Sequence, residues 1–259
     1  MEKPKIVILP PNEIGQKEKI LFIDGELVNI LPEPGPRPHS IEDNSTQYFG
    51  IWDDTSDPNY ITRNDIISVC DPGGVDLFDD GWLKYKYNGK YLYIAKKPLR
   101  YSVSWDSLYL LGAIYGTPND PGPYSTENDY DPREIFINQD ATITKNNFKY
   151  KIRMLTGGNK NPVTSAGGEW NKLITTAKDG TFDNLTNEDL HTYAVGPGPS
   201  INAAVSWCQE TTTHEYPRFR LTRGSDDSSF SASVASNTSN IFGWRPVLEL
   251  IETINIKKI

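Results

Sequence analysis

The sequence predicts an α+β fold in which two helices flank small antiparallel sheets and long loops. Short β-like runs recur along the chain and are separated by turn-forming residues. Two segments, 105–115 and 169–177, instead carry apolar residues at helical spacing. The chain holds 20 Gly and 19 Pro, which favours loops, and 6 Trp and 14 Tyr, which supply rings for a core. Its 259 residues are enough for one large domain with an appendage.

Residues 1–31 are predicted to form an N-terminal β arm. They contain β-like runs at 6–9, 20–23 and 27–31, which can pair as one or two hairpins. Hairpins of this size are marginally stable alone and need a partner surface. We therefore expect the arm to pack on the main domain, on a second copy or on a larger assembly, and attachment is its predicted role.

A proline-rich linker, residues 32–45, is expected to join this arm to the main domain, residues 46–259. It begins with PEPGPRP, and prolines at alternate positions favour an extended, semi-rigid chain. A polyproline ligand for a partner groove is the functional alternative. A short strand at 48–52 opens the main domain.

The clearest local structure is a hairpin at 82–96, because Asn88-Gly89 is a type I′ turn signal. Folding about this turn gives the cross-strand pairs Leu83–Ile94, Tyr85–Leu92, Lys84–Tyr93 and Lys86–Tyr91. The first two pairs make an apolar face, and the last two a cationic and aromatic face. Solvated lysine stems lying on rings are expected there, with capture of a glycan or a carboxylate as the alternative. A second hairpin is predicted at 142–155, around Asn146-Asn147.

The two helices are predicted from capping and spacing. Ser104 can cap the first, and Gly116 can end it. Its apolar side carries Trp105, Leu108, Leu111 and Tyr115, and that of the second helix carries Trp170, Leu173, Ile174 and Ala177. Trp105 and Trp170 are each expected to anchor the core rather than to contact a ligand.

The stretch 218–250 is the predicted functional part of the chain. Strand-like ends at 219–222 and 246–251 enclose about twenty residues of Ser, Asn, Asp, Gly and Ala, which can bury little apolar surface. A long loop clamped between core strands is functional or disordered. The candidate binding residues are Asp226, Asp227, Ser229, Phe230, Ser233, Ser236, Asn237, Thr238 and Asn240. Phe230 is either a contact anchor or a staple that folds back onto the loop.

Several segments carry a family resemblance. Arg223-Gly224-Ser225 followed by Gly243-Trp244-Arg245 is similar to the closing half of the formylglycine-generating-enzyme (sulfatase-modifying-factor) branch of the C-type-lectin-like fold. The segments YFGI, GWLKY, LYIAKKPLRYSVSW, YKIRMLTGG, GGEWNKLI, SWCQET and GWRPVLEL more closely resemble a group of phage virion proteins. They run in that order from Tyr48 to Leu250, about four-fifths of the chain.

This resemblance implies a C-type-lectin-like domain in a non-enzymatic phage structural protein. Such a protein is a tail fibre, head fibre or head decoration that is made in the host cytoplasm and displayed on the virion. Its expected partners are other virion proteins through the N-terminal arm, and a host cell-surface glycan or protein. A homo-oligomer is also expected. A virion-borne glycan hydrolase and a purely structural cement protein remain the alternatives.

Six residues are expected to serve as structural anchors of that domain: Trp105, Trp170, Trp207, Arg223, Trp244 and Arg245. Trp244 is expected to be buried, and Arg245 to bond backbone carbonyls or a carboxylate at the base of the loop.

Few catalytic patterns occur. The related oxidases bind copper through cysteines before the closing motif, but the stretch from Arg223 to Gly243 contains none, so neither that metal site nor a cofactor is expected. The calcium-binding EPN, QPD and WND motifs of sugar-binding lectins are absent. No G-x-S-x-G segment offers a nucleophile to His191 or His214. Paired carboxylates remain permitted, because sequence spacing does not report their separation.

Charge and apolar pattern exclude other classes of partner. A net charge of −8 and a pI near 5 disfavour nucleic-acid binding, which needs a basic surface. No apolar run reaches the length of a transmembrane helix, so membrane insertion is not expected. Cys70 and Cys208, the only two cysteines, are predicted to be buried free thiols.

Overall fold

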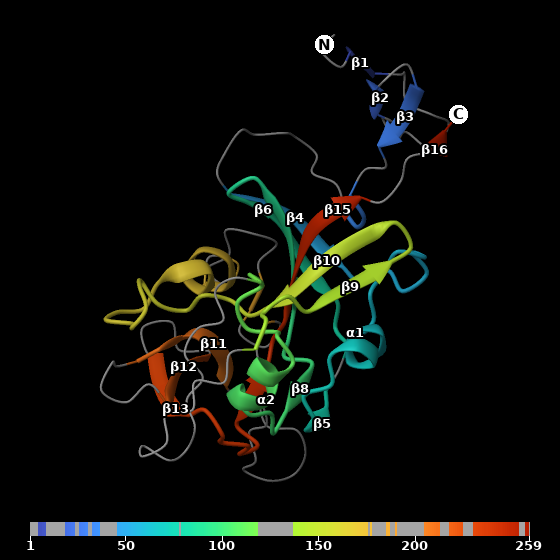
Figure 1. Ribbon diagram of the computed structural model, residues 1–259. Helices are drawn as coiled ribbons and strands as arrows, with labels where there is room; N and C mark the ends of the chain where they lie inside the picture. The colour runs from blue at the N-terminus through green and yellow to red at the C-terminus, as the bar shows by residue number, and fades with distance from the viewer. Residues whose placement is uncertain are drawn as a thin grey trace.

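The computed structural model describes residues 5–8, 19–23, 26–30, 33–36, 46–77, 79–118, 137–175, 177, 185–186, 190, 205–212, 218–224, 230–253 and 257–258. Within them the chain is mainly β (Figure 1), with two six-stranded sheets, a smaller four-stranded sheet and three short helices. The expected α+β, C-type-lectin-like arrangement built on two helices is therefore wrong. The helices have six or seven residues each, so strands supply most of the framework.

The central sheet is antiparallel throughout. Its order is β4 (Thr46–Trp52), β6 (Trp82–Tyr87), β7 (Lys90–Ala95), β15 (Val247–Thr253), β10 (Phe148–Arg153) and β9 (Thr142–Lys145). Strand β15, which comes last in sequence among these six, thus lies in the middle of the sheet, between two hairpins that are local in sequence. Both hairpins were predicted, and both are confirmed by their registers.

The lateral sheet gathers strands from distant parts of the chain. Its order is β13 (Phe230–Val234), β12 (Phe219–Gly224), β11 (Val205–Thr211), β14 (Phe242–Trp244), β8 (Arg100–Tyr101) and β5 (Val75–Asp76). The β11–β14 pair is parallel, and the other pairs are antiparallel. β11 contains Trp207, one of the expected structural anchors.

A terminal sheet unites both ends of the chain. Its order is β1 (Lys5–Ile8), β2 (Lys19–Ile23), β3 (Glu26–Ile30) and β16 (Lys257–Lys258). The arm expected at 1–31 thus pairs with a strand from the opposite end of the chain. Figure 1 shows this sheet beyond β15, on the side of the molecule away from β13.

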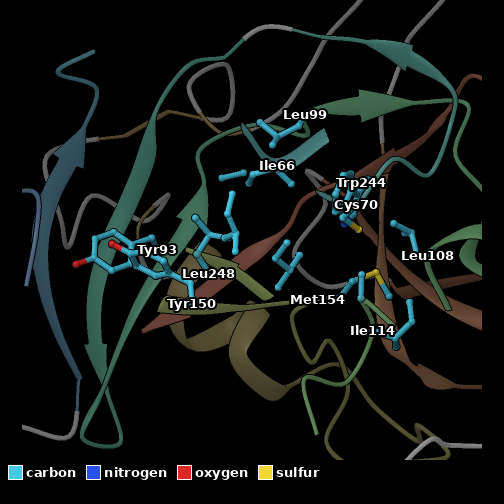
Figure 2. Packing of buried hydrophobic residues seen from close by; sticks show 14 of the residues in the cluster. Ile66, Cys70, Tyr93, Leu99, Leu108, Ile114, Tyr150, Met154, Trp244 and Leu248 are labelled. Carbon is cyan, nitrogen blue, oxygen red and sulfur yellow. The ribbon is translucent and has the colours of Figure 1, made fainter. Parts of the chain in front are cut away.

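Both faces of the central sheet are buried. One apolar cluster contains Trp82, Tyr93 and Leu248, and a second contains Leu83, Ile94 and Val247, which alternate with them along the same strands. Figure 2 shows part of the first cluster, where Tyr93, Tyr150 and Leu248 from three neighbouring strands lie together. Aromatic residues contribute to both clusters, so rings fill much of the core on each face of the sheet.

The two predicted helices are shorter than expected, and a third helix was not predicted. Ser104 caps α2 (Trp105–Leu110) as expected, but the helix ends at Leu111, before Gly116. Gly112 then has a φ of 72°, and a Cβ there would lie 2.5 Å from the Asn138 carbonyl oxygen, so the chain must turn.

The other two helices differ in opposite ways. The second predicted helix is a π-helical turn, η1 (Trp170–Thr175), although its expected apolar face is buried. The unpredicted helix α1 (Arg63–Val69) starts with a capping box formed by Thr62 and Asp65. The Thr-x-x-Asp spacing was a visible signal for it.

Residues 33–36 of the proline-rich segment lie against the central sheet. The Tyr93 hydroxyl donates to the Pro34 carbonyl at 2.8 Å, and Lys84 Nζ donates to the Pro36 carbonyl at 2.9 Å. Lys84 Nζ also lies 3.7 Å from a Glu33 carboxylate oxygen and over the ring of Phe49. Both hairpin lysines lie over rings, as expected: Lys84 over Tyr91 and Tyr93, and Lys86 over Tyr91. Lys84 is 0% exposed, however, so the expectation that it is solvated is wrong.

We predict that these contacts stabilise the main domain. A chain that starts at Pro32 keeps both hydrogen bonds, whereas one that starts at Ser40 loses both. One bond to a charged donor and one to a neutral donor together contribute roughly 2–4 kcal/mol. We expect the Ser40 chain to unfold at lower denaturant with that loss of free energy.

A double-mutant cycle isolates the hydroxyl contact. Tyr93→Phe should cost about 1 kcal/mol in the Pro32 chain. It should cost almost nothing in the Ser40 chain, where the Pro34 carbonyl is already absent. Equal costs in the two chains would show that residues 33–36 do not use this hydroxyl.

Candidate functional site

Three arginines, Arg220 and the two of the closing motifs, are buried in the interior. Arg220 and Arg223 lie on β12, and Arg245 follows β14; all three are at most 1% exposed. The Arg220 guanidinium carbon lies 3.8 Å from the centroid of the Trp105 ring. Burial lowers the pKa of Arg220, and this cation–π contact with the indole ring offsets part of that cost.

Trp170 is the ring near which the other two arginines meet. The guanidinium carbons of Arg223 and Arg245 lie 5.8 and 5.4 Å from its centroid. Arg223 donates to the Gly157 carbonyl at 2.6 Å and to Asn171 Oδ1 at 2.9 Å. These contacts join β12 to the π-helical turn and to the loop before it.

Arg245 bonds backbone carbonyls of two distant segments. It donates to the Lys96 carbonyl at 3.0 Å and also to the Leu190 carbonyl. Burial lowers its pKa to about 9, which leaves the guanidinium charged at neutral pH. All six residues named as structural anchors, Trp105, Trp170, Trp207, Arg223, Trp244 and Arg245, are buried.

The glycine-rich turn at 156–160 holds a carboxylate of its own chain. The Gly157 and Gly158 N–H groups donate to the Glu210 carboxylate at 3.0–3.2 Å. A Cβ at Gly157 would lie 2.6 Å from Cys208 Sγ, so glycine is required for this close approach. The N–H groups of Gly157 and Gly158 are thus already occupied by Glu210.

A second buried carboxylate network lies beside this turn. Arg153 binds Glu169 through two parallel hydrogen bonds of 2.7 and 2.8 Å and binds Glu249 through Nε at 2.9 Å. Lys90 completes the network with a 2.8 Å contact to Glu249. Burial alone would lower the pKa of Arg153, but the two carboxylates raise it above its ordinary value.

The predicted recognition loop contains a strand. β13 pairs with β12 from Phe230 to Val234, whereas a loop was expected throughout 226–240. Asp226, Asp227 and Ser229 lie outside the described residues, as does the side chain of Phe230.

The rest of the predicted binding set lies on β13 and in the turn after it. Ser233 is buried and accepts a hydrogen bond of 3.0 Å from Asn237 Nδ2. Ser236 is half-buried, whereas Thr238 and Asn240 are exposed. The structure therefore divides the set: Ser233 and Asn237 hold the turn together, and Thr238 and Asn240 remain accessible.

The two cysteines are free and buried, as predicted. Burial raises the pKa of Cys70 to about 12, and that of Cys208 well above its ordinary value. Neither thiol is therefore ionised at neutral pH, so neither supplies a thiolate nucleophile or metal ligand in this state. In the part of the chain that the structure describes, no group of His, Cys, Asp and Glu has the arrangement of a metal site.

Sequence reasoning missed Lys84, Glu210 and Arg220. Lys84 was placed on the correct face of the hairpin, but the Pro36 carbonyl and the Glu33 carboxylate that its Nζ contacts lie 48 or more residues away in sequence. Glu210 lies between the polar residues Gln209 and Thr211, and Arg220 alternates with Phe219 and Leu221. Both patterns are typical of solvent-facing positions. The glycines at 157–158 were the one visible signal for a close backbone approach.

Comparison with protein-family models, curated proteins and solved structures finds no match. Among the described residues, no helix has the length and apolar character needed to cross a membrane.

Glu210 gives a prediction of pH dependence. Burial raises its pKa to about 7 from an ordinary value of 4.5, against the opposing effect of its backbone hydrogen bonds. The folded state therefore holds a proton that the unfolded state releases between pH 4.5 and 7. Its contribution to stability is present below the lower value and is lost as pH rises through the higher one, by up to roughly 3 kcal/mol.

Glu210→Gln should remove this part of the pH profile. In denaturant titrations, the variant should lose less free energy of unfolding between pH 5 and pH 8 than the unmodified chain. Glu249→Gln is the matched control, because the pKa of Glu249 is lowered and its contribution is lost at acidic pH instead. Parallel profiles for the unmodified chain and Glu210→Gln would contradict a raised pKa at Glu210.

Proposed function

We propose that the chain is a non-enzymatic structural protein of a phage virion that displays a surface for binding the host. It is a tail fibre, a head fibre or a head decoration, made in the host cytoplasm and carried on the particle. The phage assignment is supported by the ordered segments from Tyr48 to Leu250 that resemble phage virion proteins. The binding role rests on the exposed turn at residues 238–241.

The observation that carries the proposal is the exposed turn that follows β13. Residues 238–241 are exposed and combine Thr, Ser and Asn with Ile241, which is 41% exposed. The preceding strand is fixed to β12, whose Arg220 and Arg223 are held by Trp105, Gly157 and Asn171. Small polar groups on a rigid base are suited to recognition, because little conformational entropy is lost on binding.

The arrangement also supports separate ends for attachment and display. The terminal sheet lies beyond β15, and β13 lies at the opposite side of the molecule (Figure 1). We propose that the terminal sheet, which includes the N-terminal arm, binds other virion proteins. The turn after β13 then faces the host, where its partner is a cell-surface glycan or protein. Copies of the chain associate as a homo-oligomer in the particle.

Two observations favour display over catalysis. The two thiols are buried, and three carboxylates of the interior each have a partner within the protein. Glu169, Glu210 and Glu249 are held by backbone N–H groups, Arg153 or Lys90. A glycosidase needs two carboxylates that face a sugar. The proposal therefore assigns these acids to the interior framework.

We predict that charge added to the turn abolishes attachment to host cells. Thr238→Glu combined with Asn240→Glu places two carboxylates on the exposed turn and leaves the Ser233–Asn237 hydrogen bond in place. Binding of the labelled protein to whole host cells should fall at least about tenfold, which corresponds to about 1.4 kcal/mol. The melting temperature should change little, because surface substitutions usually alter stability by less than about 0.5 kcal/mol.

The matched control adds the same charge elsewhere. Asn64→Glu with Thr144→Glu alters exposed positions on α1 and β9, which lie away from β13 in Figure 1. This control should bind host cells like the unmodified chain. Equal binding by both double variants would place recognition elsewhere, and shortening of host polysaccharide by the protein would identify the hydrolase instead. Failure of the unmodified chain to bind cells would favour the cement protein.

A further inference from the structure

β13 is an edge strand of the lateral sheet, and in the part of the chain that the structure describes it lacks the features that protect the other edges of the two large sheets. Within the described residues, no strand lies beyond it, and it has five residues without a charge or a proline. Ser231 and Ala232 are exposed. Exposed edges of this kind are open to pairing with another strand.

The other edges of these sheets carry recognisable protection. β4 has a register irregularity between Tyr48 and Gly50. β9 has four residues, and its Lys145 is paired with Asp65 of the neighbouring helix α1. β5 is only two residues long. Bulges, short strands and edge lysines are the ordinary means by which proteins prevent pairing.

The backbone of β13 presents its hydrogen-bonding groups at Ala232. The N–H group of Ala235 donates to the Arg218 carbonyl at 2.8 Å, which fixes the side of the strand that faces β12. Because N–H and C=O groups of alternate residues face opposite sides of an antiparallel strand, Ser231 and Ser233 also face β12. The N–H and C=O of Ala232 therefore point to the free side.

We infer that β13 of two copies pairs antiparallel about a twofold axis at Ala232. This inference rests on the self-association included in the proposed function and assigns it a surface. The sequence FSASV is self-complementary about its centre: Phe230 is placed opposite Val234, Ser231 opposite Ser233, and Ala232 opposite its own copy. No like charges face one another, and Ser–Ser pairs stabilise antiparallel strands.

The interface is small, so the free dimer is weak. Five residues a side bury far less than the roughly 1,200–2,000 Å² of a stable complex. On a particle the local concentration of copies is high, and a weak contact then suffices. The exposed turn at 238–241 lies outside the paired residues, so host binding and pairing can coexist.

Cysteine crosslinking tests the axis directly. Ala232→Cys places two thiols opposite each other in a hydrogen-bonded pair, whose Cα atoms are about 5.5 Å apart, within the range of about 4.4–6.8 Å that a disulfide spans. The native thiols are buried and free. Under mild oxidation of the full chain at high concentration, Ala232→Cys should form covalent dimer at least tenfold faster than Thr238→Cys, which lies six positions from the axis.

Sedimentation supplies the second measurement. The unmodified chain should show a concentration-dependent dimer, and Ala232→Lys should weaken it at least tenfold with an unchanged melting temperature. A dimer that persists in Ala232→Lys overturns this interface but leaves self-association intact. An unmodified chain that stays monomeric, together with equal rates of crosslinking in Ala232→Cys and Thr238→Cys, overturns both. Host-cell binding by Ala232→Lys separates either failure from failure of the display role.

Discussion

The burial of guanidinium groups against indole rings is the constraint on which the rest of the interior depends. Arg220 lies on Trp105, and Arg223 and Arg245 lie near Trp170. A buried charge is tolerated only when its donors are satisfied, because its desolvation is costly. The Gly157 carbonyl accepts from Arg223, and the Lys96 and Leu190 carbonyls accept from Arg245, so three segments distant in sequence are tied to these guanidinium groups.

This layer of arginines and indole rings connects the two large sheets. Apolar clusters with members from both sheets lie around it, so the central sheet and the lateral sheet share one interior. The exposed turn after β13 lies outside this interior. A rigid framework that carries an exposed turn suits the display role proposed above.

The parts of the fold that depend on local chemistry could be predicted. The Asn88-Gly89 turn determines the register of β6 and β7, and Ser104 determines where α2 begins. The length of α2 was overestimated although a local stop signal was present: Gly112 follows the C-cap Leu111 with a φ of 72° and ends the helix before Gly116.

The candidate site was predicted only in part for the same reason. Lys84 interacts with residues 33–36, and Glu210 interacts with Gly157 and Gly158, through contacts that local pattern does not encode. Similarly, the sequence of 226–240 indicated exposure, but the pairing of Phe230–Val234 with β12 depends on a partner strand.

Hydrogen exchange of the native protein tests most directly whether the buried arginine layer unites the two sheets. The slowest amides of β11 and β12 should exchange only through global unfolding, with the same free energy and denaturant dependence as those of β6, β7 and β15. Exchange of β11 and β12 through a separate, lower-energy opening would contradict the account.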